Sequence, residues 1–320
     1  MQAFEYANPT TVQEAAGLLG SQWGEADVLA GGTDLLSLMK EYLHTPKRVV
    51  NIKNIKELEG IHRQGGDLRI GALVTIDELA KSHEAPRAIV EAAAGVPSPQ
   101  IRHMGTAGGD LCQRPRCWYY RQGLGLLGEQ NGKALVPGGE NKYHSIFGDG
   151  PAYFVSASSL GPALVALNAR VKLVSAKGSR EVKVADFFVS PKDQNTREIA
   201  LRPDEILTEI LVPAANVQSA TYEVRQKEAL DWPLAAASVS LTMNGRTVSA
   251  ARVVLGHVAP TPHFAAQAEA AIKGKPVNEA NAEAAGKAAV AGAKPLSQNA
   301  YKVTLAKVAV KRAILAAVKA

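Results

Sequence analysis

The sequence contains very few cysteines: there are two in 320 residues, Cys112 and Cys117, and they lie close together. Two thiols cannot form a disulfide framework. Alone they also cannot complete a four-cysteine zinc site or an iron–sulfur cluster, although His103 and His144 are available to supplement them. Because unpaired cysteines mostly pack as small apolar side chains, we expect two reduced thiols and no metal ion bound by this chain.

Long apolar runs are also missing. A membrane-spanning helix needs about 20 consecutive apolar residues, and the sequence has no such run. Residues 1–6 show neither the basic region nor the apolar core of a signal peptide. We therefore expect no membrane insertion and a cytoplasmic location.

Aromatic residues make up only 5% of the chain, and the net charge is +6. The basic surplus is C-terminal, since the sequence from Thr221 onward holds 13 Lys+Arg against 6 Asp+Glu. A nucleic-acid reader would be expected to cluster such charge with aromatics or in a known motif. Here the lysines are scattered through alanine-rich sequence over residues 265–320, which is typical of a solvated helix face. We expect no nucleic-acid partner.

Two glycine pairs, each with a threonine and an aspartate beside it, are the most informative motifs present. The first glycine turn consists of Val28, Leu29, Ala30, Gly31, Gly32, Thr33, Asp34 and Leu35, and the second of Thr106, Ala107, Gly108, Gly109 and Asp110. Glycine permits φ > 0, so successive N–H groups can point at an anion with no Cβ in the way. Neither turn has the lysine of a Walker loop or the three glycines of a dinucleotide fingerprint. Each alone could be an ordinary turn; together they favour one bound phosphate ligand.

The first half of the chain predicts α/β units. Thr11 and Glu14 mark a helix start, residues 27–30 and 48–52 are strand-like, and residues 34–42 are helical between them. Residues 58–70 alternate around Gly65-Gly66 as a hairpin does, and a capping box at Thr75 precedes another helix.

The second half predicts strands followed by helices. Residues 164–174 and 180–184 are strand-like, a further strand ends at Pro213, and residues 214–220 are the best linker candidate. Apolar runs on both sides of Asn244-Gly245 indicate a hairpin. The amphipathic tail, residues 301–320, is expected to pack on that hairpin sheet.

Taken together, these residues resemble the FAD-binding medium subunit of the molybdenum hydroxylase family, which includes xanthine dehydrogenase and carbon monoxide dehydrogenase. The similarity rests on both glycine turns, on Pro203-Asp204-Glu205-Ile206-Leu207 and on Asn299-Ala300-Tyr301-Lys302. It implies an α+β fold with two α/β subdomains in a vanillyl-alcohol-oxidase-like, PCMH-type FAD-binding domain, then a C-terminal domain of a small antiparallel sheet with helices. The implied boundaries are 1–57, 58–217 and 218–320.

The resemblance implies that FAD binds between the two N-terminal subdomains. It assigns cofactor contacts to the first glycine turn, to Thr106, Gly108, Gly109 and Asp110, and to Val96, Ser159, Ile206, Leu207 and Lys227. Carboxylates repel phosphate, so Asp34 and Asp110 are expected to order the turns or bind ribityl hydroxyls.

An insertion at residues 113–152 is similar to that of the aldehyde oxidoreductase and 4-hydroxybenzoyl-CoA reductase branch, where it binds a [4Fe-4S] cluster. Of the ligand positions only Cys117 holds a cysteine. Ala152 replaces the cysteine of an expected Gly-Pro-Cys-Tyr motif. Four thiolates hold such a cluster, so we expect none in this chain. The aromatic residues 118–120 could anchor a partner or simply pack the insertion.

Two further positions depart from the family pattern. Its Pro-Ser-Asp motif is replaced by Ala157-Ser158-Ser159, and its lysine near the flavin by Glu223 or Val224, with Arg225 and Lys227 as nearby cations. These changes bear on flavin affinity and potential.

The resemblance implies an electron-transfer subunit of a molybdenum hydroxylase complex. Substrate would be oxidised on a molybdopterin-binding large subunit, and electrons would pass through a [2Fe-2S] small subunit to this flavin and then to an external acceptor. Periplasmic export remains open if a signal-bearing partner carries the folded complex. A stand-alone flavin oxidoreductase and a flavin-free assembly subunit are the alternatives.

Overall fold

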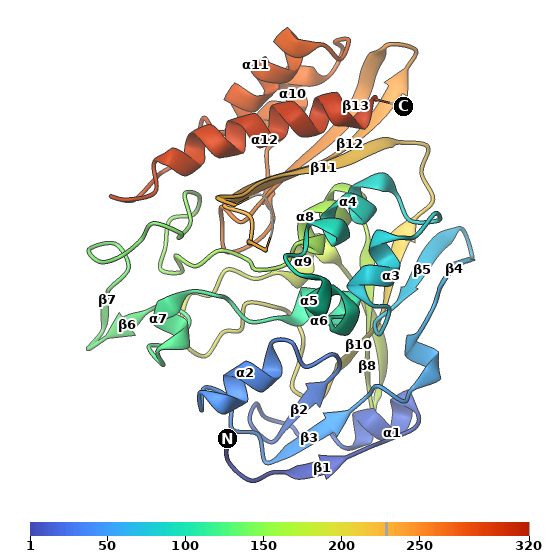
Figure 1. Cartoon of the computed structure of the whole chain (residues 1–320), viewed down its shortest axis with the longest axis vertical. Helices are drawn as coiled ribbons and strands as arrows, with labels where there is room; N and C mark the ends of the chain where they lie inside the picture. Colours follow the sequence, from blue (N-terminus) through green and yellow to red (C-terminus); the bar gives the residue numbers. More distant parts are fainter. Residues whose placement is uncertain (228–229, 320) are drawn as a thin grey trace.

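The computed structural model describes residues 1–227 and 230–319. Figure 1 shows three main sheets stacked along the long axis of the molecule, with α5 (Pro99–Met104) and α6 (Ala107–Cys112) between the N-terminal sheet and the C-terminal one. No helix in these described residues is long and apolar enough to cross a membrane.

The N-terminal sheet is parallel, with strand order β1-β3-β2. Its elements are β1 (Glu5–Ala7), α1 (Val12–Gly17), β2 (Ala26–Leu29), α2 (Leu35–Lys40) and β3 (Arg48–Asn51), followed by the 3-10 turn η1 (Lys56–Leu58). Thr11 caps α1, since its side chain accepts the N–H of Glu14, as the sequence predicts. The first glycine turn follows the end of β2 and leads into α2.

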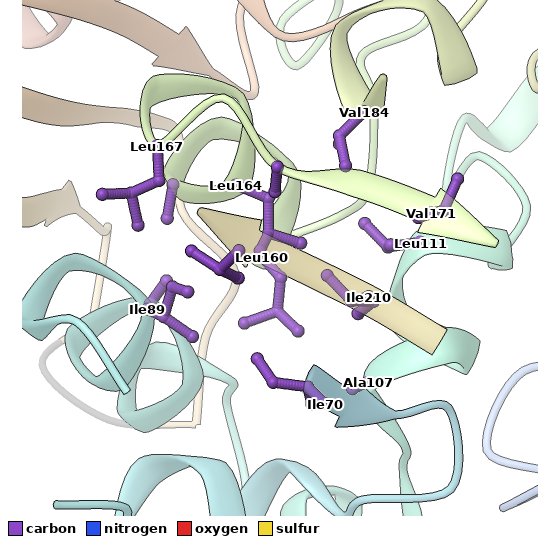
Figure 2. Close-up of a cluster of buried hydrophobic side chains, with 14 of the residues drawn as sticks. Ile70, Ile89, Ala107, Leu111, Leu160, Leu164, Leu167, Val171, Val184 and Ile210 are labelled. Carbon is purple, nitrogen blue, oxygen red and sulfur yellow. The ribbon is translucent and has the colours of Figure 1, made fainter. Parts of the chain in front are cut away.

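The central sheet is antiparallel, with strand order β4-β5-β10-β8-β9. Its strands are β4 (Ile61–Gln64), β5 (Asp67–Gly71), β8 (Arg170–Ser175), β9 (Gly178–Lys183) and β10 (Ile206–Pro213). Besides α5 and α6, its helices are α3 (Ile76–Ala80), α4 (Arg87–Gly95), α8 (Leu160–Ala166) and α9 (Val184–Phe187). Figure 2 shows Ile70 and Ile210, from neighbouring strands, packed with Leu111 of α6 and Leu160 and Leu164 of α8.

One strand prediction was wrong in part. The apolar run at 164–174 is not continuous strand, because residues 160–166 form α8 and the strand begins only at Arg170. Short apolar runs do not distinguish a buried helix from a strand by periodicity alone. The linker is also shorter than predicted, since β11 (Gln218–Val224) begins inside it.

The C-terminal sheet is antiparallel, with strand order β11-β12-β13-β14. It contains β11, β12 (Ala235–Asn244), β13 (Thr247–Gly256) and β14 (His263–Phe264), covered by α10 (Ala266–Ile272), α11 (Glu279–Ala289) and α12 (Tyr301–Ala317). The hairpin turn at Asn244-Gly245 and the packing of the last helix on this sheet are confirmed. Alanines fill much of this core, which lets the helices lie close to the strands.

The insertion lies on one side of the molecule, to the left in Figure 1. Its regular elements are α7 (Trp118–Arg121), β6 (Glu129–Gln130) and β7 (Lys133–Ala134). The side chain of Lys302, on α12, donates to the backbone oxygens of Tyr143 at 3.2 Å, His144 at 3.2 Å and His257 at 2.7 Å. These bonds attach the insertion to the C-terminal helix.

Candidate cofactor-binding site

The first glycine turn packs directly against the approach to the second. A Cβ on Gly31 would lie 1.7 Å from the carbonyl oxygen of Met104, so only glycine fits there. Gly32 adopts φ +74°, a conformation that favours glycine. The two motifs, 70 residues apart in the sequence, therefore meet in space, as a shared ligand site requires.

Free backbone donors are found on the first glycine turn. Among the described residues, none accepts a hydrogen bond from the N–H groups of Gly31, Gly32 or Thr33. Successive unpaired N–H groups beside a glycine form the kind of concavity that binds phosphate oxygens. The turn thus offers three backbone N–H donors and the Thr33 hydroxyl to a ligand. Gly31 and Gly32 have no Cβ that could cover these donors.

The second glycine turn uses its own donors internally. The N–H of Ala107 bonds to Val74 at 2.8 Å and that of Gly108 to Ala72 at 3.0 Å. The N–H of Gly109 bonds to the Thr106 hydroxyl at 3.1 Å, which caps α6. This turn therefore serves to position α6, and its contribution to a ligand is limited to exposed edges such as the Thr106 hydroxyl.

Both turns open into one cleft, which we call the cofactor cleft. It encloses about 1070 Å³ of empty space, solvent at its mouth included, a size comparable to pockets that hold large organic ligands. Of the residues proposed from the sequence, it is lined by Val28, Ala30, Gly31, Gly32, Thr33, Asp34, Leu35, Val96, Thr106, Gly109 and Asp110. Segments far apart in the sequence thus share one wall.

Six of the proposed residues do not line the cleft: Leu29, Gly108, Ser159, Ile206, Leu207 and Lys227. Gly108 packs on Ala72, where a Cβ would come within 2.9 Å of the alanine Cβ. Ile206 and Leu207 are buried in apolar clusters. Lys227 is exposed. These residues support the walls or lie away from the cleft.

The two aspartates order the turns. Asp34 accepts the N–H of Arg114 at 2.8 Å and the guanidinium of Arg121 at 2.7 Å, which joins the first glycine turn to the insertion. Asp110 accepts the Ser158 hydroxyl at 2.5 Å and the N–H of Leu160 at 3.0 Å. It thereby caps α8 from another helix. Burial raises the pKa of Asp110, and these hydrogen bonds oppose that rise.

The cations proposed near the flavin are not free in this cleft. Arg225 is paired with Glu223 at 2.5 Å. Burial raises the pKa of Glu223 to about 7, although Arg225 works against that rise. Glu223, one of the two residues expected at the family's lysine position, is thus buried and paired with Arg225.

Sequence reasoning missed two aromatic–guanidinium pairs that line the cleft. Arg197 lies over the ring of Trp23 at 4.0 Å, and Arg116 over the ring of Trp232 at 3.8 Å. Tryptophan is rare here, three in the whole chain. That rarity was the available signal, since two of the three border the cleft.

A polar chain also lies beside the cleft. His44 is 3.1 Å from Asp27 through Nδ1 and 3.2 Å from the Tyr120 hydroxyl through Nε2. Asp27 and His44 belong to the N-terminal unit and Tyr120 to the insertion. The Asp27–His44–Tyr120 contacts therefore give the insertion a second polar attachment to the N-terminal unit, besides that of Asp34.

The insertion brings Cys117 and His144 together, with Sγ and Nε2 3.2 Å apart. Burial and the nearby charge of Lys302 lower the pKa of His144 to about 4. In the part of the chain that the structure describes, no three His, Cys, Asp or Glu side chains gather as a metal site would require. One thiol and one imidazole fall short of the ligands of a cubane cluster.

The sequence matches the models of two domains that follow one another along the chain, both from flavoproteins of molybdopterin dehydrogenases. Residues 2–215 match the FAD binding domain in molybdopterin dehydrogenase, and residues 220–317 match the CO dehydrogenase flavoprotein C-terminal domain. The chain belongs to this flavoprotein family. The expected fold class is thereby confirmed: a PCMH-type FAD-binding domain followed by a C-terminal domain of sheet and helices.

Two curated relatives align with nearly the whole chain. The carbon monoxide dehydrogenase medium chain of Hydrogenophaga pseudoflava is 31% identical and aligns over 98% of this chain and 96% of its own length. The aldehyde oxidoreductase FAD-binding subunit PaoB of Escherichia coli K12 is 30% identical, with 96% of each chain covered. These relatives are subunits of oxidoreductases, and this chain is an oxidoreductase subunit of the same family.

Solved structures agree with this assignment. A carbon monoxide dehydrogenase chain from Hydrogenophaga pseudoflava superposes with a TM-score of 0.76 at 31% identity, covering 99% of this chain and 97% of that one. A chain of quinoline 2-oxidoreductase from Pseudomonas putida 86 gives a TM-score of 0.76 at 25% identity, over 99% and 97% of the two chains. Both solved chains thus share the architecture of this chain over nearly its whole length.

Proposed function

We propose that this chain is the FAD-containing electron-transfer subunit of a molybdenum hydroxylase complex. Its partners would be a molybdopterin-binding large subunit and a [2Fe-2S] small subunit. Electrons from substrate oxidised on the large subunit would reach the flavin through the small subunit and leave to an external acceptor. Membership of the flavoprotein family and the medium chains among the relatives support this proposal.

The observation that carries the proposal is the contact between the two glycine turns. Gly31 lies against Met104, and the N–H groups of residues 31–33 remain free of protein acceptors in the described residues. A pyrophosphate needs several hydrogen-bond donors, and these unpaired N–H groups can supply them. Bound FAD supplies a ring that accepts electrons singly or in pairs, while the protein provides placement and charge.

The chain's own residues would then divide the work. Gly31, Gly32 and Thr33 would hold the pyrophosphate, and Thr106 and Gly109 would line its other side. Asp34 and Asp110 fix the turns from behind, as their hydrogen bonds indicate. We propose that Ser159, Ile206 and Leu207 act as supports, and we keep 57/58 and 217/218 as domain boundaries.

We further propose that the chain carries no [4Fe-4S] cluster and works in the cytoplasm. Cys117 has His144 as its neighbour instead of further thiols. The insertion is held by protein contacts, among them the Lys302 ammonium on backbone oxygens and Asp34 on Arg121. Such contacts can order it without metal.

The test is to isolate the tagged full-length chain from its native cells and to measure molybdenum, iron and flavin in the complex. About one molybdenum and one flavin per chain are expected, together with iron from the [2Fe-2S] small subunit. A chain that turns over a substrate without partners would support the stand-alone oxidoreductase. A colourless chain within an active complex would support the flavin-free assembly subunit.

A further inference from the structure

The cofactor cleft is bordered by two aromatic–guanidinium pairs that come from different parts of the fold. Trp23 lies just before β2, and Trp232 lies just before β12. Figure 1 shows α5 and α6 between the N-terminal sheet and the β11–β12 pair. Both aromatic–guanidinium pairs line the same cleft as the glycine turns, one contributed by the segment before β2 and the other by the segment before β12. FAD, with a planar ring at each end of a pyrophosphate, matches this arrangement.

The two guanidinium groups differ in their charge environment. Arg197 has Glu198 at 3.7 Å, and Glu198 is also paired with Arg114 at 2.6 Å. The side chain of Arg197 is only 15% exposed. This end of the cleft therefore holds arginines with a carboxylate already between them.

Arg116 has no such partner within residues 1–227 and 230–319. Its contact there is an amide, since it donates to Oε1 of Gln113 at 3.0 Å. Arg116 lines the cleft and is exposed there. Desolvation by the surrounding protein lowers the pKa of its guanidinium to about 10, and the more distant charges of Asp34 and Asp110 oppose that fall. The guanidinium remains protonated at neutral pH, and stacking on Trp232 fixes its position.

A cation of this kind matters for a ring whose charge changes. The adenine of FAD keeps the same charge in every redox state. The end of the cleft where Glu198 already balances the charge of Arg197 therefore suits adenine. Oxidised FAD that takes up two electrons and one proton gains one negative charge, which a cation without a direct ion-pair partner can stabilise. In the complex the electrons would arrive singly from the [2Fe-2S] partner, and in a titration they come from dithionite.

We propose that Arg116, held on Trp232, faces the isoalloxazine end of bound FAD and stabilises the negative charge that the ring gains on reduction. This inference rests on the proposed function. Arg116 takes over the role that the sequence had left to Arg225 or Lys227, of which one is paired with Glu223 and the other lies outside the cleft. Arg116 acts on the ring through its positive charge and does not donate a proton to it.

The experiment compares the full-length wild-type chain, Arg116→Gln, Arg116→Lys and Arg197→Gln, each loaded with FAD. Oxidised FAD affinity is measured by fluorescence, and the two-electron midpoint potential by dithionite titration against a reference dye. In Arg116→Gln we expect reduced FAD to bind about tenfold more weakly with oxidised affinity nearly unchanged. That lowers the potential by about 30 mV for a two-electron couple. Arg116→Lys should stay close to wild type.

A pH profile separates a charge effect from a structural one. Removing the cation should raise the pKa of the reduced ring by about one unit, the same tenfold change, so the break in potential against pH moves upward. Arg197→Gln should weaken both redox forms equally and leave the potential in place. The control for general stability is Arg312→Gln. It removes a guanidinium that lies on α12 and stacks over the ring of Tyr222, a residue of β11.

An Arg116→Gln variant with an unchanged potential and an unmoved break would overturn the inference while leaving the proposed function standing. Equal weakening of oxidised and reduced FAD would also overturn it, because the guanidinium would then contact the pyrophosphate. A wild-type chain that fails to retain FAD would instead overturn the proposed function, and this inference with it.

Discussion

Gly31 and Met104 are in direct contact: a Cβ on the glycine would lie 1.7 Å from the methionine carbonyl oxygen. Gly31 follows β2 in the N-terminal unit, and Met104 ends α5 in the central one. This contact fixes the distance between the two glycine turns, and with it the geometry of the cofactor cleft.

Replacing Gly31 by Ala should therefore separate the turns. We expect FAD affinity to fall at least tenfold, and the free energy of unfolding of the FAD-free chain to fall by about 1–3 kcal/mol, as for an overpacked contact. Flavin fluorescence and urea unfolding measure the two effects. Gly138→Ala is the matched control, since no atom lies within 4 Å of a Cβ there. Wild-type affinity in Gly31→Ala would refute the shared cradle.

Removing the Asp34 carboxylate should loosen the insertion. Asp34→Ala leaves the guanidinium of Arg121 without its carboxylate partner, although its bonds to the carbonyl oxygens of Pro115 and Arg114 remain. Both side chains are less than one-fifth exposed, 15% for Asp34 and 18% for Arg121. We expect a loss of about 2–3 kcal/mol, typical of a hydrogen bond to a charged group. Limited trypsin digestion should then cut first within residues 113–152. Asp149→Ala, which removes an exposed ion pair with Lys294, should leave the digestion pattern unchanged.

Acid should destabilise the chain through His144. Its pKa is about 4 in the folded chain against 6.5 as the ordinary value, so below pH 6.5 the unfolded chain binds a proton that the folded chain does not. The contribution of His144 to stability is thus lost as pH falls from 6.5 toward 4, by about 2 kcal/mol between pH 7 and pH 5. Buried His257, whose pKa is lowered to about 3, adds a loss of the same sign, and Glu223, whose pKa is raised to about 7, opposes it. Urea unfolding at both values measures this loss. It should shrink in His144→Gln and persist in His62→Gln, an exposed site; equal losses in both variants would contradict the assignment.

Local signals made much of the fold predictable. The capping box at Thr75 and the turn at Asn244-Gly245 form as expected because each depends on neighbours in the sequence. Helix α8 was missed because its cap is tertiary: the carboxylate of Asp110, 50 residues away, accepts the N–H of Leu160. A sequence pattern cannot display such a partner.

The cofactor cleft shows the same division. The glycine turns could be recognised from the local sequence, since Gly31 and Gly32 are followed by a threonine and an aspartate. Their unequal roles could not, because the donors of the second turn are used by Ala72 and Val74 in the central unit. The Arg116–Trp232 pair joins residues more than a hundred positions apart and depends wholly on the fold.

The most direct test of the account is the absorption spectrum of the purified full-length chain combined with iron analysis. Binding of FAD in the cofactor cleft predicts flavin bands near ~450 nm, about one flavin per chain released on denaturation, and no iron. The bands should be lost in Gly31→Ala and retained in Gly138→Ala. A colourless wild-type chain that does not take up added FAD would contradict the central claim, and about four irons per chain would contradict the absence of a cluster.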